Sequence, residues 1–234
     1  MKLQKETESP KQDSHGKWYG DACGTAFALE LVGERWSLLI VRELMLGGRR
    51  FSDLRASLPG ISAKVLTERL AGLEQAGVLV RRKLPPPAAS QVYELTEWGY
   101  LAEPAIQELG RWAARSPEHD PTLPLSAVSF MISMRTMLDR DAAGGLEATL
   151  GFDVAGEQFV GRLAGGALPI RREEPRDVEV LFRAPTPMEL AALFYGKMPF
   201  DAWAAGAGRA IEGDRALAER FVDLFWLPEK VGPG

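Results

Sequence analysis

Hydrophobic residues recur at three- and four-residue spacing through the first half of the chain, as they do on one face of an amphipathic helix. Glycines and a proline–glycine turn interrupt this pattern, so the sequence predicts several short helices instead of one long helix. The last of them begins at Ser62, a good N-cap, and places Leu66, Leu70 and Leu73 on its buried stripe. The predicted helices cover residues 22–32, 36–46, 51–58 and 62–76.

The pattern changes from helices to strands after Gly77. Residues 78–80 predict a strand that leads into three basic residues, prolines 85–87 predict an extended loop tip, and residues 91–96 predict the returning strand. A further helix is expected from Glu97 to about Arg115, broken or kinked near Pro104. Helices followed by a two-stranded ribbon indicate a winged helix-turn-helix, which sets one helix in the major groove of DNA and the ribbon against the backbone.

Charge is distributed unevenly along the chain, whose net charge is −4. Residues 42–83 contain nine basic and four acidic residues, a local excess of +5, whereas residues 121–234 are acidic overall. Such a positive region favours a DNA-binding module with an acidic companion, although charge alone would equally fit a solvated helical surface.

Double-stranded DNA is therefore the expected partner of the first half. The start of the helix at Ser62 is expected to reach base edges, and the basic turn and ribbon are expected to pair with phosphates. The predicted DNA-binding residues are Arg49, Arg50, Ser62, Ala63, Lys64, Thr67, Arg69, Arg81, Arg82 and Lys83.

The same part of the chain resembles the HxlR-type family of bacterial transcriptional regulators, over about residues 20–115. The residues that carry the resemblance are Cys23, residues 29–36 (LELVGERW), Leu39, Ile40, Leu44, Gly48, residues 50–54 (RFSDL), residues 60–62 (GIS), Leu66, Thr67, Arg69, Leu70, Leu73, Glu74, Gly77, Tyr93, Leu95 and Thr96. The resemblance implies a homodimer that joins through the first and last helices of the module. Apolar positions that one winged-helix core cannot all use are Ala26, Leu29, Ile106, Leu109 and Trp112.

The second half of the chain follows a polar linker punctuated by prolines, residues 117–124. Strands are predicted over residues 146–154, 157–163, 167–170, 178–183 and 209–212. Helices are predicted over residues 125–138, over residues 187–195 and after Asp214, which is expected to cap the last of them. From about Leu146 onward the sequence resembles the SCP2-like sterol- and lipid-carrier fold. The resemblance rests on a strand meander and a helix, followed in order by Gly196, Lys197, Gly206, Gly208, Gly213, Asp214, Leu217, Leu224 and Phe225.

Residues 121–234 contain five of the seven methionines and eleven of the twenty aromatic residues. Such side chains can line a pocket for an apolar small-molecule effector, and they can equally fill an α/β core. The residues predicted to line the pocket are Met131, Met134, Phe159, Phe182, Leu190, Phe194, Trp203 and Phe221.

Several kinds of chemistry are not expected from this sequence. One cysteine and two histidines cannot form a Cys/His zinc cluster or an internal disulfide, so no metal or cofactor is predicted, and the single cysteine fits a reducing cytoplasm. No catalytic motif and no apolar run of membrane-spanning length is found, so neither an enzyme nor a membrane partner is expected. Cys23, at the start of the first helix, is a candidate redox sensor, with an inert structural thiol as the alternative.

The sequence as a whole predicts a multi-domain α+β protein. A mobile arm (1–17) precedes a winged helix-turn-helix domain (18–116), a linker (117–124) and an SCP2-like α/β domain with a mostly antiparallel sheet (125–234), which would bind a ligand or mediate dimerisation. The predicted function is a homodimeric DNA-binding regulator that an apolar ligand modulates. The alternative is a lipid or small-molecule carrier whose winged helix makes only protein contacts.

Overall fold

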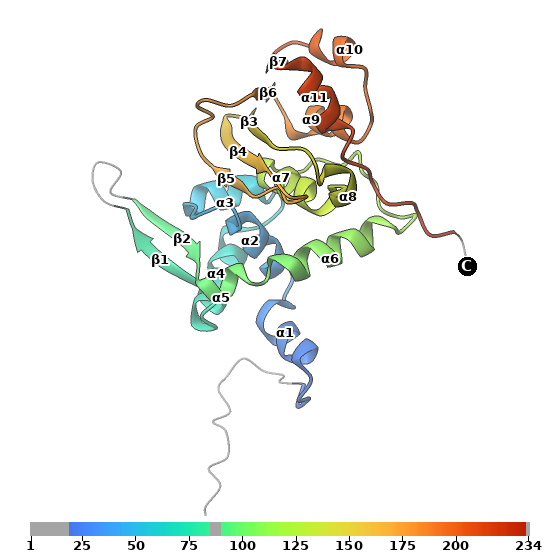
Figure 1. Cartoon of the computed structure of the whole chain (residues 1–234). Coiled ribbons are helices and arrows are strands. Elements are labelled where there is room, and N and C mark those ends of the chain that lie inside the picture. The colour runs from blue at the N-terminus through green and yellow to red at the C-terminus, as the bar shows by residue number, and fades with distance from the viewer. Residues whose placement is uncertain (1–18, 85–89, 233–234) are drawn as a thin grey trace, which may run out of the picture.

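The computed structural model describes residues 19–84 and 90–232, so the predicted arm and the proline tip lie outside the described residues. The helices and the ribbon predicted for the first half are confirmed, and their bounds move by a few residues at most (Figure 1). The helix expected over 97–115 is broken just before Pro104. The elements are α1 (Gly24–Val32), α2 (Ser37–Leu44), α3 (Phe51–Ser57), α4 (Ala63–Gln75), β1 (Leu79–Lys83), β2 (Gln91–Leu95), α5 (Glu97–Tyr100) and α6 (Glu103–Ala114).

Local sequence rules account for the placement of α4 and the hairpin. The Ser62 hydroxyl accepts a hydrogen bond from the backbone N–H of Val65 at 3.2 Å, which satisfies a donor at the first turn of α4. The leucine stripe of α4 is buried against α2, and Gly77 ends the helix region with φ of +72°. β1 then pairs antiparallel with β2, with Leu79 opposite Leu95.

The second half forms a five-stranded sheet in the order β5-β4-β3-β6-β7, covered by helices (Figure 1). Only the β3–β6 pair is parallel, so the predicted mostly antiparallel sheet is confirmed. The elements are α7 (Ala127–Met137), α8 (Arg140–Ala143), β3 (Ala148–Val154), β4 (Glu157–Leu163), β5 (Ile170–Arg172), β6 (Val180–Ala184), α9 (Pro187–Phe194), α10 (Phe200–Ala204), β7 (Ala210–Gly213) and α11 (Arg215–Val222).

The largest differences from the prediction are two short helices and the position of one strand. Helices α8 and α10 have four and five residues, too few to show a helical period in the sequence. The strand expected over 167–170 begins only at Ile170, because Ala164 and Ala167 close a tight turn over two glycines with positive φ.

The side chains predicted to line an apolar pocket form the core of the second half. All eight are fully buried, and Phe194 packs edge to face against two other rings of the set, with centroids 5.2 Å apart for Phe182–Phe194 and 5.8 Å apart for Phe194–Phe221. The structure therefore corrects the pocket expected at Met131, Met134, Phe159, Phe182, Leu190, Phe194, Trp203 and Phe221 to a filled core.

The two halves pack directly against each other through α7, which contacts α2 and α6. Buried residues on both sides of the 117–124 connection belong to one continuous hydrophobic core. A polar contact crosses the same junction, because the Ser126 hydroxyl donates to Glu43 Oε1 at 2.6 Å. Residues 117–124 therefore connect two halves that share one hydrophobic core.

The last described residues return to the first half. Lys230 Nζ donates to the carbonyls of Ala114, Ser116 and His119 at 2.8–3.0 Å, and the backbone N–H of Val231 donates to the Arg115 carbonyl at 2.8 Å. A lysine suits this position because the carbonyls at the end of α6 carry partial negative charge.

Candidate nucleic-acid interface

The N-terminal turn of α4 presents small polar and basic side chains to solvent. Ser62, Lys64 and Thr67 are exposed, and Ala63 is half-buried. The Lys64 side chain is 85% exposed, and its Nζ lies 3.9 Å from Glu68 Oε1. An exposed ion pair at this distance is weak, so Lys64 remains free to contact another group. The structure thus brings together the four side chains expected to read bases, on the first two turns of one helix.

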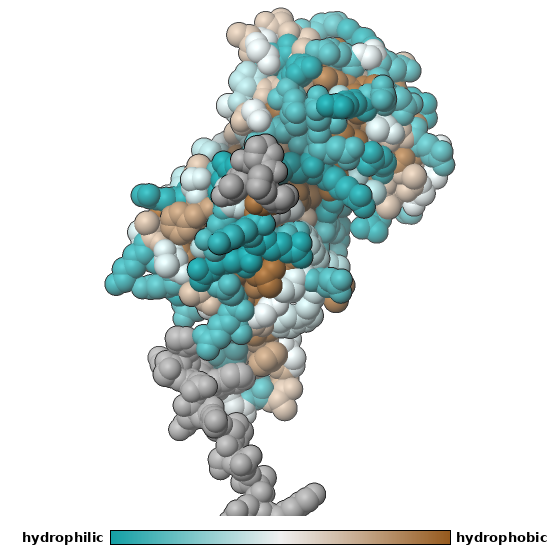
Figure 2. Space-filling model, turned by 90° about the vertical axis from the view of Figure 1, so that its left-hand side faces the viewer, coloured by the Kyte–Doolittle hydropathy of each residue, from teal (hydrophilic) through white to brown (hydrophobic). Residues whose placement is uncertain are grey.

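The β1–β2 hairpin carries the second basic group. Arg81, Arg82 and Lys83 are consecutive exposed residues on β1, and side-chain alternation along a strand sends Arg82 to the face opposite the other two. Arg81 pairs with Glu74 at 2.7 Å and Arg82 pairs with Glu94 at 3.1 Å. Hydrophilic surface predominates around the hairpin in Figure 2, which views the molecule from this side. Exposed pairs of this kind are weak, so both arginines remain able to exchange a glutamate for a phosphate.

Arg50 and Arg69 lie next to these groups but differ in what they contact. Arg50 is exposed, and its Nε donates to the Ser90 hydroxyl at 3.1 Å, which places it beside the hairpin. Arg69 donates to the Arg35 carbonyl at 3.1 Å and to Glu34 at 2.8 Å. Arg69 therefore connects α4 to the loop before α2.

The structure corrects the expectation for Arg49. Its side chain is 9% exposed, and its guanidinium lies 3.5 Å from Glu43 and 3.3 Å from Glu157. The backbone N–H and C=O of Arg49 pair with Tyr93, and the side chain turns toward the second half of the protein. The guanidinium lies between the two halves, paired with carboxylates of both, so we do not assign Arg49 to the phosphates of DNA.

Cys23 is exposed and lies at the N-cap of α1. The backbone N–H of Thr25, followed by that of Ala26, lowers the pKa of the Cys23 thiol below its usual value. The physical cause is the partial positive charge of a helix N-terminus, which favours a thiolate.

Apolar side chains gather on α1 and α6 without cover from the rest of the described chain. No side chain of α1 is buried by the residues that the structure describes, and Leu29 is 49% exposed. Leu109 and Trp112 on α6 are 49% and 75% exposed. Ala26 is half-buried, whereas Ile106 is buried inside its own subunit, so Ile106 is removed from the predicted dimer contact.

Residues 19–84 and 90–232 offer neither a metal-binding cluster nor a membrane-spanning helix. No group of three or more His, Cys, Asp or Glu side chains in these ranges is placed to hold a metal ion. No helix in that part of the chain is both long enough and apolar enough to cross a membrane.

Comparison with known proteins gives matches to the first half. The HxlR-like helix-turn-helix family model matches residues 31–121. The uncharacterized HTH-type transcriptional regulator YvaP of Bacillus subtilis (strain 168) is 40% identical over 86 residues, which is 37% of this chain and 80% of YvaP. The HTH-type transcriptional regulator YodB of the same organism is 38% identical over 96 residues, 41% of this chain and 86% of YodB.

A solved structure gives a similar alignment. The reduced form of YodB from B. subtilis is 38% identical, covers 42% of this chain and 98% of its own, and has a TM-score of 0.38. The relatives are named as transcriptional regulators and not as enzymes, and the family model ends at residue 121, so most of the second half lies outside it.

Proposed function

Because the chain belongs to the HxlR-like helix-turn-helix family of transcriptional regulators, we propose that it binds a two-fold related DNA operator as a homodimer. The observation that carries the proposal is the exposed start of α4 beside a hairpin with three consecutive basic residues. Ser62, Ala63, Lys64 and Thr67 are assigned to base edges. Arg50, Arg81, Arg82 and Lys83 are assigned to phosphates, which set the register of the protein without reading sequence.

Replacing both Arg81 and Arg82 with alanine tests this assignment. Binding should weaken alike for a duplex that the protein selects from a random library and for an unrelated duplex, because phosphate contacts carry no sequence information. The slope of log K against log salt should fall by about 0.9 for each phosphate that the variant no longer neutralises. Fluorescence anisotropy at four salt concentrations measures both quantities.

The matched control replaces Arg162 and Arg176, two exposed arginines of the second half that also pair with glutamates. This control should leave the affinity and the slope unchanged. An unchanged slope in the Arg81/Arg82 variant would remove the hairpin from the DNA contacts.

The homodimer is proposed to join through α1 and α6. The exposed apolar side chains Leu29, Leu109 and Trp112 lie on these two helices, and a two-fold axis between them would place both copies of α4 on one face. Recognition helices about one DNA turn apart, about 34 Å, would then meet successive major grooves.

A redox-sensing role is proposed for Cys23, whose lowered pKa gives more thiolate at a given pH. The chain has no second cysteine, so oxidation would end in a disulfide between subunits or in an adduct with a small thiol. The rate of alkylation by iodoacetamide, followed against pH, should have its midpoint below about 8.5, the ordinary thiol value. The same thiol in the urea-unfolded chain is the control, and an equal midpoint in both states would favour an inert structural thiol.

The second half is proposed to be an SCP2-like domain that receives an effector. Its mostly antiparallel sheet with covering helices supports this reading. Because the aromatic interior is filled, we place the effector outside that interior, where both halves can contact it.

A further inference from the structure

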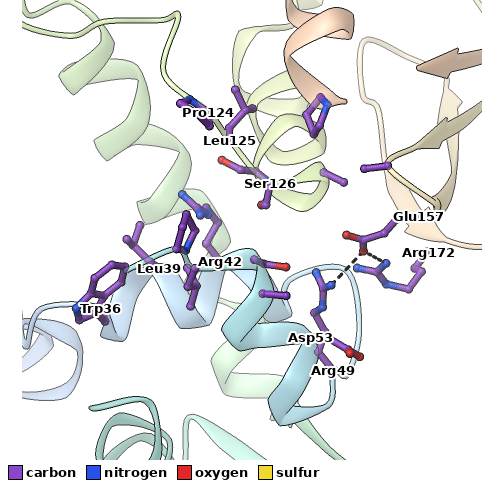
Figure 3. Close-up of a pocket in the computed structure, with 18 of the residues that line it drawn as sticks. Trp36, Leu39, Arg42, Arg49, Asp53, Pro124, Leu125, Ser126, Glu157 and Arg172 are labelled. Carbon is purple, nitrogen blue, oxygen red and sulfur yellow. Dashed lines mark hydrogen bonds and ion pairs between the residues drawn. The ribbon is translucent and has the colours of Figure 1, made fainter. Parts of the chain in front are cut away.

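An open cleft of about 800 Å³ lies where the two halves meet (Figure 3). Ligand sites commonly have volumes of about 300–1,000 Å³ and often lie at domain interfaces. The first half contributes α2, α3 and the turn that follows α3, and the second half contributes the start of α7 and the edge of the sheet. The lining residues used below are Trp36, Leu39, Arg42, Arg49, Asp53, Pro59, Leu125, Glu157 and Arg172.

One end of the cleft holds guanidinium groups with unused hydrogen-bonding capacity. Arg172 pairs with Glu157 through Nη1, while its buried Nη2 has no hydrogen-bond partner among the described residues. Arg49 lies 3.3 and 3.5 Å from its two carboxylates, beyond the ~2.7–2.9 Å of a good charge-assisted hydrogen bond. A buried donor without a good partner is costly, so a turn of the partly exposed Arg172 side chain that brings Nη2 to an acceptor in the cleft would be stabilising.

The rest of the cleft is apolar. Trp36 and Leu39 line it from below and Leu125 from above, in the view of Figure 3. Asp53 and Glu157 also face the cleft, and with the buried Glu43 they balance the charges of Arg42, Arg49 and Arg172. Affinity for an anion must therefore come from directed hydrogen bonds and apolar contact, not from a net positive field.

We propose that this cleft binds an organic carboxylate with an apolar body. The carboxylate accepts hydrogen bonds from Arg172 and Arg49, and the apolar body lies against Trp36, Leu39 and Leu125. This carboxylate would be the effector proposed above, and its effect on DNA binding rests on that proposed function.

The cleft contacts the residues that orient α4. Pro59 lines it and lies three residues before Ser62. The Trp36 ring lies close to Gly60, within 3.8 Å of where a side chain would begin there, and Arg69 of α4 binds the carbonyl of the preceding residue, Arg35.

Trp36 itself has φ of +83°, a left-handed conformation that is strained for a bulky residue. Such a conformation persists only where neighbouring residues stabilise it, and Trp36 contacts these neighbours on one side and the cleft on the other. A ligand pressing on Trp36 and Pro59 therefore changes the setting of α4, which is how occupancy would alter DNA affinity.

Calorimetry on the full chain without DNA tests the binding step, with decanoate and 2-naphthoate as probes and decanol and 2-naphthylmethanol as neutral counterparts. The carboxylates should bind at least tenfold more tightly than the alcohols. Arg172→Gln should weaken carboxylate binding by about tenfold or more, as expected when a hydrogen bond to a charged group is removed. The matched control is Arg171→Gln, the neighbouring arginine on β5, which is exposed and does not line the cleft.

A second variant, Leu39→Asp, places a carboxylate against the apolar wall at a position that is 38% exposed, and it should also weaken binding at least tenfold. Equal affinity of acids and alcohols, equal effects of the two arginine variants, or no binding to the wild type would each overturn the site.

Anisotropy with the selected duplex then tests the coupling. 2-Naphthoate at a concentration that just saturates the wild type should change DNA affinity by fivefold or more in the wild type and in Arg171→Gln. Arg172→Gln should need at least tenfold more 2-naphthoate for the same change in DNA affinity. Unchanged DNA affinity at saturation would overturn the coupling. The calorimetry is done without DNA, so it tests the ligand site alone. If the protein binds no DNA, that result contradicts the proposed regulator and not the ligand site.

Discussion

Replacing Glu43 with alanine should lower the free energy of unfolding by about 3–5 kcal/mol, the cost of breaking a buried ion pair by removing one partner. Glu43 is fully buried and accepts hydrogen bonds from Arg42 at 2.9 and 3.2 Å, from Ser126 at 2.6 Å and from Arg49 at 3.5 Å. Its removal leaves the buried Arg49 guanidinium with Glu157 as its one remaining carboxylate partner, and it cuts a polar link between the two halves. Urea unfolding followed by fluorescence measures the change.

The control for this experiment is Glu174→Ala, since Glu174 also pairs with an arginine but is 59% exposed. An exposed pair contributes about 0–1 kcal/mol, so the two decreases in stability should differ clearly. Glu43→Gln, which keeps an acceptor for Ser126, should fall between them. Equal stabilities of the Glu43→Ala and Glu174→Ala variants would show that the buried carboxylate does not hold the halves together.

Replacing both Leu109 and Trp112 with glutamate should convert the proposed dimer into a monomer and weaken operator binding a hundredfold or more. Both side chains are exposed on α6, so the single chain should still fold. A monomer would bind only one half-site. In the dimer, binding of one subunit raises the effective concentration of the other at its half-site, which increases the overall affinity by about 10²–10⁴. Light scattering should report twice the 25.6 kDa mass for the wild type and one mass for the variant.

Leu123→Glu is the matched control, because Leu123 is 62% exposed but lies in the connection between the halves. It should remain dimeric with unchanged operator affinity. A wild type that is monomeric at micromolar concentration while binding DNA tightly would contradict the dimer.

The elements that the sequence predicted best are those fixed by neighbours in the chain. Ser62 and Asp214 were expected to cap α4 and α11, and each side chain accepts from a backbone N–H three residues on. The leucine stripe of α4 has a period of three and four, so its burial follows from local geometry alone. The basic residues of β1 could also be predicted from local sequence, because a glycine before the strand and prolines after it mark its two ends.

Features set by distant partners escaped prediction. Arg49 is a basic residue in a basic turn, yet its pairing with Glu157 depends on a contact across 108 positions that no spacing reveals. The aromatic residues of the second half are of types found both in ligand pockets and in protein cores. Only their packing against one another, which the sequence does not show, distinguishes the two. The cleft could not be predicted because it exists only where two separately patterned halves meet.

The continuous core across the 117–124 connection has a thermodynamic consequence. Halves that share buried side chains cannot unfold one at a time without exposing the surface of the other, so the subunit should lose its structure in one cooperative step. Any molecule that binds only the folded chain then stabilises it by mass action as a whole. Occupancy at the junction would protect α4, the helix proposed to read DNA, from unfolding, even though the cleft is lined by no residue of α4.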